Sequence, residues 1–224
     1  MRYAVHSSDS PNALHASGVD SCEPVLIKLA NGAHAMAQPL ALLSFAVELG
    51  EQAQATEADL RRYFGLANEH LKRLCANFQS LQHLIDAAQE EVTIASVDVV
   101  DIVATAVEDW RPVFEEAGVR FHADFQNSSP PRNCDERKTM RALHAVLGVA
   151  ASISTAGELV ELQAENHALT FEITVKNRQA GVDRLGSSEL LALDVAETNM
   201  KRQRGEFKSA EDMFQVTLGI SHKT

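Results

Sequence analysis

The chain has few aromatic residues, few cysteines and no long apolar run, and each scarcity excludes a class of protein. Aromatic residues make up 5% of the chain against 45% hydrophobic residues overall, which predicts a core of Ala, Leu and Val, as in helical proteins. The cysteines (Cys22, Cys75 and Cys134) are widely spaced and odd in number. They favour reduced thiols over a disulfide framework or a metal site. No apolar run reaches membrane-spanning length, and the N-terminal residues lack the apolar core of a signal peptide, so the expected compartment is the cytoplasm.

Positive charge is also in short supply. The 20 Lys and Arg are outnumbered by 31 Asp and Glu, which gives a formal net charge of -11. Nucleic-acid backbones recruit Lys and Arg, and anionic membrane surfaces repel an acidic protein. We therefore expect neither a nucleic-acid partner nor a membrane partner. A length of 224 residues allows one domain or two small ones.

The first part of the chain carries two long apolar patterns with alternating four- and three-residue spacing. Residues 1–20 are rich in Ser, His, Asn and Gly and are expected to form a flexible tail. Thr56-Glu57-Ala58-Asp59 predicts a capping box at the start of the second helix. We predict a helical hairpin over residues 21–92. Because one hairpin cannot cover its own apolar seam, we expect a homodimer built as a four-helix bundle. The two patterns are Cys22, Leu26, Leu29, Ala33, Met36, Leu40, Leu43 and Val47, then Leu60, Phe64, Ala67, Leu71, Leu74, Phe78, Leu81 and Ile85.

From residue 96 to residue 224 the pattern changes to a mixture of helices and strands. Amphipathic spacing and alternating apolar residues distinguish the two. Helices laid on one face of a mixed sheet form a two-layer α/β sandwich, so the predicted fold class is α+β. The predicted helices are 98–117, 135–154 and 187–204, and the predicted strands are 119–125, 158–164, 168–175 and 212–220.

This order of elements resembles the core of sensor histidine kinases, in which a dimerisation and histidine-phosphotransfer bundle precedes an ATP-binding domain. The segment Ala-His-Ala-Met-Ala-Gln-Pro-Leu, residues 33–40, resembles the H-box of that family. Residues 98–103 resemble the start of the ATP-binding domain, and residues 135–157 align with its N-box helix. The resemblance implies that His34 is the phospho-acceptor. It also implies that response-regulator receiver domains dock on the bundle surface at Gln38 and Pro39.

The resemblance fails at the residues that would hold a nucleotide. Ala145 and Val149 occupy the two N-box asparagine positions, and neither offers the oxygen ligands that Mg²⁺ requires. The adenine-recognition box falls on residues 177–181 and keeps only its last glycine, while the lid shrinks to residues 186–188. The second glycine box falls on residues 190–193 without a glycine. We therefore expect no bound ATP or metal, with Mg²⁺ supplied only by the receiver, as in kinase-like histidine phosphotransferases.

His34 can also be interpreted as an ordinary surface histidine, and two features bear on the choice. Pro39 would bend the helix five residues later, and Ala33 in the apolar pattern would leave His34 projecting from the bundle. Against this, the family's acidic residue after the histidine, a general base for autophosphorylation, is Ala35 here. Two hypotheses remain open. One is a histidine phosphotransferase that shuttles phosphoryl groups to or from receivers, and the other is a catalytically dead pseudokinase that acts as a scaffold for a receiver or a kinase.

Overall fold

The computed structural model describes residues 23–51, 56–126, 129–167, 170–210 and 212–221, so the predicted tail lies outside the described residues. The first two elements are the long helices α1 (Glu23–Gly50) and α2 (Glu57–Gln89). The predicted capping box starts α2. The Thr56 hydroxyl accepts a hydrogen bond from the Asp59 backbone N–H at 3.2 Å, and the Asp59 carboxylate accepts one from the Thr56 backbone N–H at 3.1 Å.

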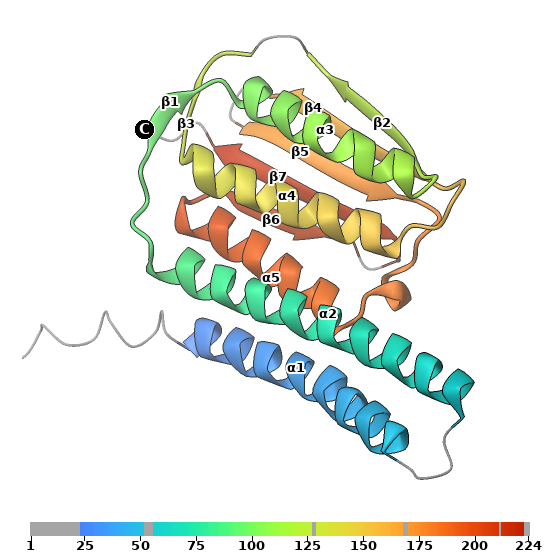
Figure 1. The fold of residues 1–224 in the computed structure, drawn as a ribbon. Helices are drawn as coiled ribbons and strands as arrows, with labels where there is room; N and C mark the ends of the chain where they lie inside the picture. Colours follow the sequence, from blue (N-terminus) through green and yellow to red (C-terminus); the bar gives the residue numbers. More distant parts are fainter. Residues whose placement is uncertain (1–22, 52–55, 127–128, 168–169, 211, 222–224) are drawn as a thin grey trace, which may run out of the picture.

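The second half of the chain is a two-layer sandwich (Figure 1), which confirms the α+β fold class. Helices α3 (Val99–Glu116), α4 (Glu136–Ile153) and α5 (Ser187–Arg202) lie on one face of a five-stranded sheet. The strand order is β2-β4-β5-β7-β6, in which β2 runs parallel to β4 and all other neighbours are antiparallel. The strands are β2 (Arg120–Phe125), β4 (Leu159–Asn166), β5 (Thr170–Asn177), β6 (Glu206–Ser209) and β7 (Phe214–Ser221).

Four short elements have no counterpart among the predicted ones. Strands β1 (Ala95–Val97) and β3 (Arg132–Cys134) pair as a separate antiparallel ribbon. A single 3-10 turn, η1 (Val182–Arg184), precedes α5, and β6 forms one edge of the sheet. Each is three or four residues long, too short to show an alternating pattern in the sequence.

The main core lies between the three helices and the sheet. Strands β4 and β5 bury alternate residues, as a half-covered sheet requires. Val113, an apolar residue of α3, is 42% exposed. The buried side of α3 passes through Val107 and the fully buried Phe114 instead.

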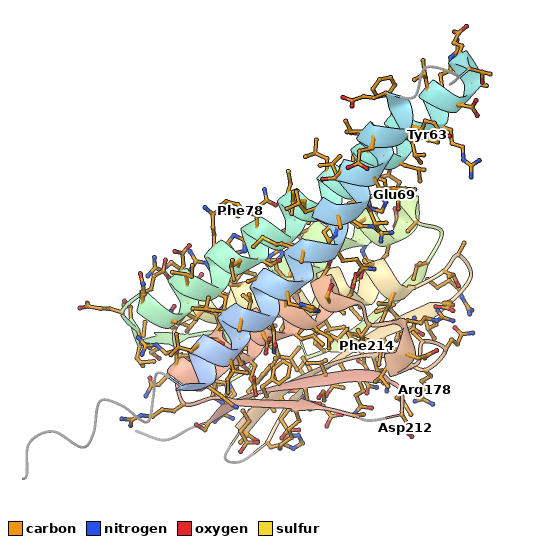
Figure 2. All side chains as sticks on the ribbon, turned by 90° about the horizontal axis from the view of Figure 1, so that it is seen from below. Tyr63, Glu69, Phe78, Arg178, Asp212 and Phe214 are labelled. Carbon is orange, nitrogen blue, oxygen red and sulfur yellow. The ribbon has the colours of Figure 1, made fainter. Side chains whose placement is uncertain are left out.

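Helix α5 lies between α4 and the hairpin, and so it connects the sandwich to the hairpin (Figure 1). A small apolar cluster joins them, in which Leu191 and Val195 of α5 meet Leu84 of α2, with Leu29 and Leu81 packed around them. Figure 2 shows the hairpin crossing the sandwich, with the end that carries Tyr63 projecting beyond it. None of the described helices combines the length and apolar character needed to span a membrane.

The predicted apolar stripe does not face the inside of a single hairpin. Ala33, predicted as a core position, is exposed, and Leu40 is 52% exposed. The side of α1 that is buried instead carries small or compact residues, Gly32, Ala35, Pro39 and Ala46. Small side chains allow α1 to lie close to its neighbours, and the larger apolar residues are left on the outside. The same offset occurs in α2, where Asn77, Leu84 and Ala87 are buried while Phe64, Leu71 and Phe78 are exposed.

Candidate functional site

His34 lies exposed on α1, in the half of the helix that runs along α5. Gln38 is also exposed, and it lies one helical turn further on because residues four apart share a helix face. Pro39 is buried. The structure therefore presents His34 and Gln38 on the surface of the hairpin, whereas Pro39 acts on this surface through the backbone.

At Gly32, two residues before His34, side chains of both α2 and α5 pack against α1. A Cβ atom placed at Gly32 would lie 2.7 Å from Leu81 Cδ1 of α2 and 3.2 Å from Leu191 Cδ1 of α5. Only a residue without a side chain fits this junction without displacing a neighbour. The turn that carries His34 is thus packed on its inner side against both α2 and the sandwich.

Ion pairs and a hydrogen bond from Lys28 connect the same part of α1 to α5. The Lys28 ammonium lies 3.2 Å from the Asp194 carboxylate and also donates to the Glu197 carboxylate and to the Thr198 hydroxyl. Burial alone would raise the pKa of Glu197, but hydrogen bonds from Lys201 and Lys28 outweigh it and lower that pKa. Glu197 therefore stays ionised at neutral pH. Nothing in the sequence pattern pointed to this contact between elements more than 160 residues apart.

A groove of about 470 Å³ lies between α2, α4 and α5, and both predicted N-box positions line it. Ala145 and Val149 contribute hydrocarbon walls, and Ala76 and Ala192 face the same space. The His144 ring is already engaged, because its Nδ1 accepts a hydrogen bond from Trp110 Nε1 at 2.8 Å. Throughout the part of the chain that the structure describes, no group of three or more His, Cys, Asp or Glu side chains could hold a metal ion.

Residues 177–181, which align with the adenine-recognition box, are hydrogen-bonded to residues at the end of α4. Buried Asn177 donates to the Ser154 hydroxyl at 2.7 Å and to the Glu158 carboxylate at 3.0 Å. Arg184 donates to the other oxygen of Glu158 at 2.8 Å. Burial would raise the pKa of Glu158, but the hydrogen bonds from Arg184, Asn177 and the Thr155 backbone together lower it to about 2. Sequence reasoning did not find this network, because its members are 19 to 26 residues apart.

The residues aligned with the second glycine box form the first turns of α5. Leu191 is 2% exposed and packs into the hairpin cluster, whereas Leu193 packs into the main sandwich core. Leu190, directly before Leu191, is 52% exposed. Helix α5 begins directly after Gly186, so the predicted lid region is a short connection followed by a packed helix.

Comparison with known proteins identifies the fold. No family model and no curated protein matches the chain. Among solved structures, the histidine kinase AdeS of Acinetobacter baumannii superposes with a TM-score of 0.62 at 16% identity, over 85% of this chain and 98% of AdeS. The histidine kinase ThkA, in complex with the response regulator TrrA, gives 0.69 at 11% identity, over 91% of this chain and 64% of ThkA. Full-length ShkA in complex with AMPPNP gives 0.54 at 15% identity, over 90% of this chain and 46% of ShkA. The chain has the fold of the sensor histidine kinase core, as its sequence predicted.

Proposed function

We propose that this protein is a histidine phosphotransferase of a two-component phosphorelay, with His34 as its phospho-acceptor. The observation that carries the proposal is the contrast between two regions of one histidine-kinase fold. His34 is exposed on the hairpin, while the groove at the N-box positions is walled by Ala145 and Val149. The residue that would carry the phosphoryl group is accessible, and the residues that would hold ATP are replaced.

The reaction is a transfer between an aspartate and a histidine. A nitrogen of the neutral His34 imidazole attacks the phosphorus of an aspartyl phosphate on a receiver domain, and the bond from phosphorus to the carboxylate oxygen breaks. The aspartate leaves as a carboxylate, and the imidazole releases its proton to solvent. The reverse reaction passes the phosphoryl group to a second receiver. Catalysis is mostly positioning, and Mg²⁺ comes with the receiver.

Three features of the sandwich support a reaction without ATP. The side chains of Ala145 and Val149 supply no oxygen ligand for a metal ion. The amide of Asn177 already donates hydrogen bonds to Ser154 and Glu158. Helix α5 starts at Ser187, where a kinase would have a long lid. In addition, Lys28 and the Leu191 cluster attach α5 to the hairpin. A kinase must bring its nucleotide domain to the histidine, and this attachment opposes such a movement.

The partners follow from the hairpin surface. The histidine kinase ThkA forms a complex with the response regulator TrrA, and by analogy we propose that a receiver docks over His34 and Gln38 of this chain. We also propose that the chain forms a homodimer through the outer side of the hairpin, because large apolar side chains are exposed along both helices and burying each contributes about 1.5–3 kcal/mol. Figure 2 places Phe78 on the side of α2 away from the sandwich, where a second copy could cover it. These exposed residues are Leu26, Ile27, Leu40, Leu42, Phe45, Val47, Phe64, Leu66, Leu71 and Phe78.

A catalytically dead scaffold is the second candidate, and Ala35 favours it. Ala35 is 2% exposed, so the position after His34 points into the hairpin and supplies no acid or base next to the imidazole. A scaffold would bind the receiver or a kinase through the same surface without taking its phosphate.

The two candidates are separated by offering the protein a receiver domain phosphorylated with acetyl phosphate. The phosphotransferase proposal expects acid-labile label on the wild type and on His83→Ala, a control at another exposed histidine of the hairpin. It expects none on His34→Ala or His34→Gln. Binding of the phosphorylated receiver without any transfer would establish the scaffold instead.

A further inference from the structure

A buried amide lies against the turn that carries His34. Asn77, in the middle of α2, is 2% exposed, and its Nδ2 donates a hydrogen bond of 2.9 Å to the backbone carbonyl of Ala35. Burying an amide in an apolar seam is costly unless its polar atoms are paired. No described residue donates to its Oδ1, so Asn77 makes a single side-chain bond across the hairpin, and that bond ends next to His34.

Pro39 explains why the Ala35 carbonyl needs a partner from another helix. In an α-helix the carbonyl of residue 35 accepts its hydrogen bond from the N–H of residue 39. Pro39 has no N–H, and its ring crowds the carbonyl four residues earlier. The Ala35 carbonyl is therefore the one that proline frees, and the Asn77 amide replaces the missing donor.

We infer that Asn77 is a positioning residue for His34, holding the proline-interrupted turn so that the imidazole is presented in one orientation. Gly32 is packed against Leu81 and Leu191 on one side of His34, and the Ala35 carbonyl is held on the other. His34 thus projects from a backbone segment that is fixed on both sides. The inference rests on the proposed phosphotransfer function and adds a residue on α2 that the reaction needs.

A substitution at position 77 can separate the positioning of His34 from any contribution of Asn77 to stability. Leu would fill nearly the same volume and remove the unpaired Oδ1, which raises stability, but it would leave the Ala35 carbonyl without a donor, which lowers it. The two effects on the free energy of unfolding therefore partly cancel. Asp is unsuitable as a test, because a carboxyl buried here would be protonated and its O–H could donate to the Ala35 carbonyl. Asn77→Leu therefore removes the positioning bond while it keeps nearly the volume of the side chain.

A double-mutant cycle tests the inference, with transfer measured from a receiver domain phosphorylated with acetyl phosphate. Asn77→Leu should lower the transfer rate at saturating receiver about tenfold, with unchanged receiver affinity. Pro39→Ala restores the backbone N–H to the helix. In that background the further change Asn77→Leu should have no effect on the rate. An equal loss in both backgrounds, or no loss with Pro39 present, would overturn the inference.

A matched control and a second readout keep the two proposals distinguishable. Asn199 is also fully buried, donates to one backbone carbonyl (Val195, 3.1 Å) and has an unpaired Oδ1, but it lies in α5. Asn199→Leu should leave transfer unchanged. The His34 ring signals in ¹³C-histidine NMR should broaden or double in Asn77→Leu and sharpen again when Pro39→Ala is added. If the wild type takes no phosphate, the phosphotransfer proposal fails, and the NMR cycle still supports or overturns the positioning role.

Discussion

Leu191→Ala should release the hairpin from the sandwich without unfolding the sandwich. Leu191 is 2% exposed, and it is buried by Leu84, Val195, Leu29 and Leu81 rather than by the main core. The substitution removes the side-chain carbons beyond Cβ, and at about 0.8 kcal/mol for each the lost transfer free energy is about 2.4 kcal/mol. The cavity left behind places the total in the range of about 2–5 kcal/mol.

This loss of free energy weakens the packing of α1 and α2 against α5, because Leu191 contributes little to the sandwich core. A change of 2.4 kcal/mol corresponds to about 50-fold in an equilibrium constant, since about 1.4 kcal/mol is tenfold. Hydrogen exchange measured by mass spectrometry should therefore show about 50-fold lower protection in residues 26–37 of α1. Protection in β4 and β5 should stay at the wild-type level.

The matched control is Leu193→Ala, the same substitution two residues along the same helix. Leu193 belongs to the core cluster of the sandwich, so its loss should lower protection in β4 and β5 and reduce the stability of the whole sandwich. The reasoning is refuted if Leu191→Ala and Leu193→Ala give the same exchange pattern, or if Leu191→Ala leaves α1 as protected as in the wild type.

Three further predictions concern acid stability, assembly and nucleotide binding. Because the pKa of Glu158 is lowered from 4.5 to about 2, the stability that its carboxylate contributes is complete above pH 4.5 and is lost as pH falls toward 2. The melting temperature followed by circular dichroism should thus fall more steeply in this range for the wild type than for Glu158→Gln, and parallel curves would contradict the network. Sedimentation should find a dimer that the pair Leu71→Glu and Leu74→Glu dissociates or unfolds. Leu190→Glu, at a leucine exposed on α5, should leave it intact, and a monomeric wild type at micromolar concentration would exclude the dimer. Calorimetric titration with Mg²⁺-ATP should give no saturable heat, and micromolar affinity would contradict the interpretation of Ala145 and Val149.

The sequence predicted the elements whose signals are local. The capping box at Thr56, the amphipathic α3 and α4, and the alternating strands β4 and β5 depend on neighbouring residues, and all are confirmed. Short β1, β3 and β6 were missed, because three or four residues carry no periodicity.

The packing of the hairpin could not be predicted from the same patterns. The spacing of large apolar residues identified a seam, but in a single chain the contact to α2 is made by the small side of α1, so Ala35 is buried and Ala33 exposed. The attachment of α5 through Leu191 and Lys28 depends on residues more than 100 positions away. Asn77 lies between two positions of the apolar pattern, Leu74 and Phe78, and nothing in the sequence singles it out. Its role follows once its amide is seen opposite the carbonyl freed by Pro39.

The most direct test of the central claim is a relay between two receiver domains in the absence of ATP. One receiver carries labelled aspartyl phosphate, the second is unlabelled, and the two exchange no label when mixed alone. Adding the wild-type protein should move label first to His34 and then to the second receiver, and His34→Gln should stop both steps. Label that reaches the second receiver in the presence of His34→Gln, or that enters the wild type only from ATP, would contradict the account.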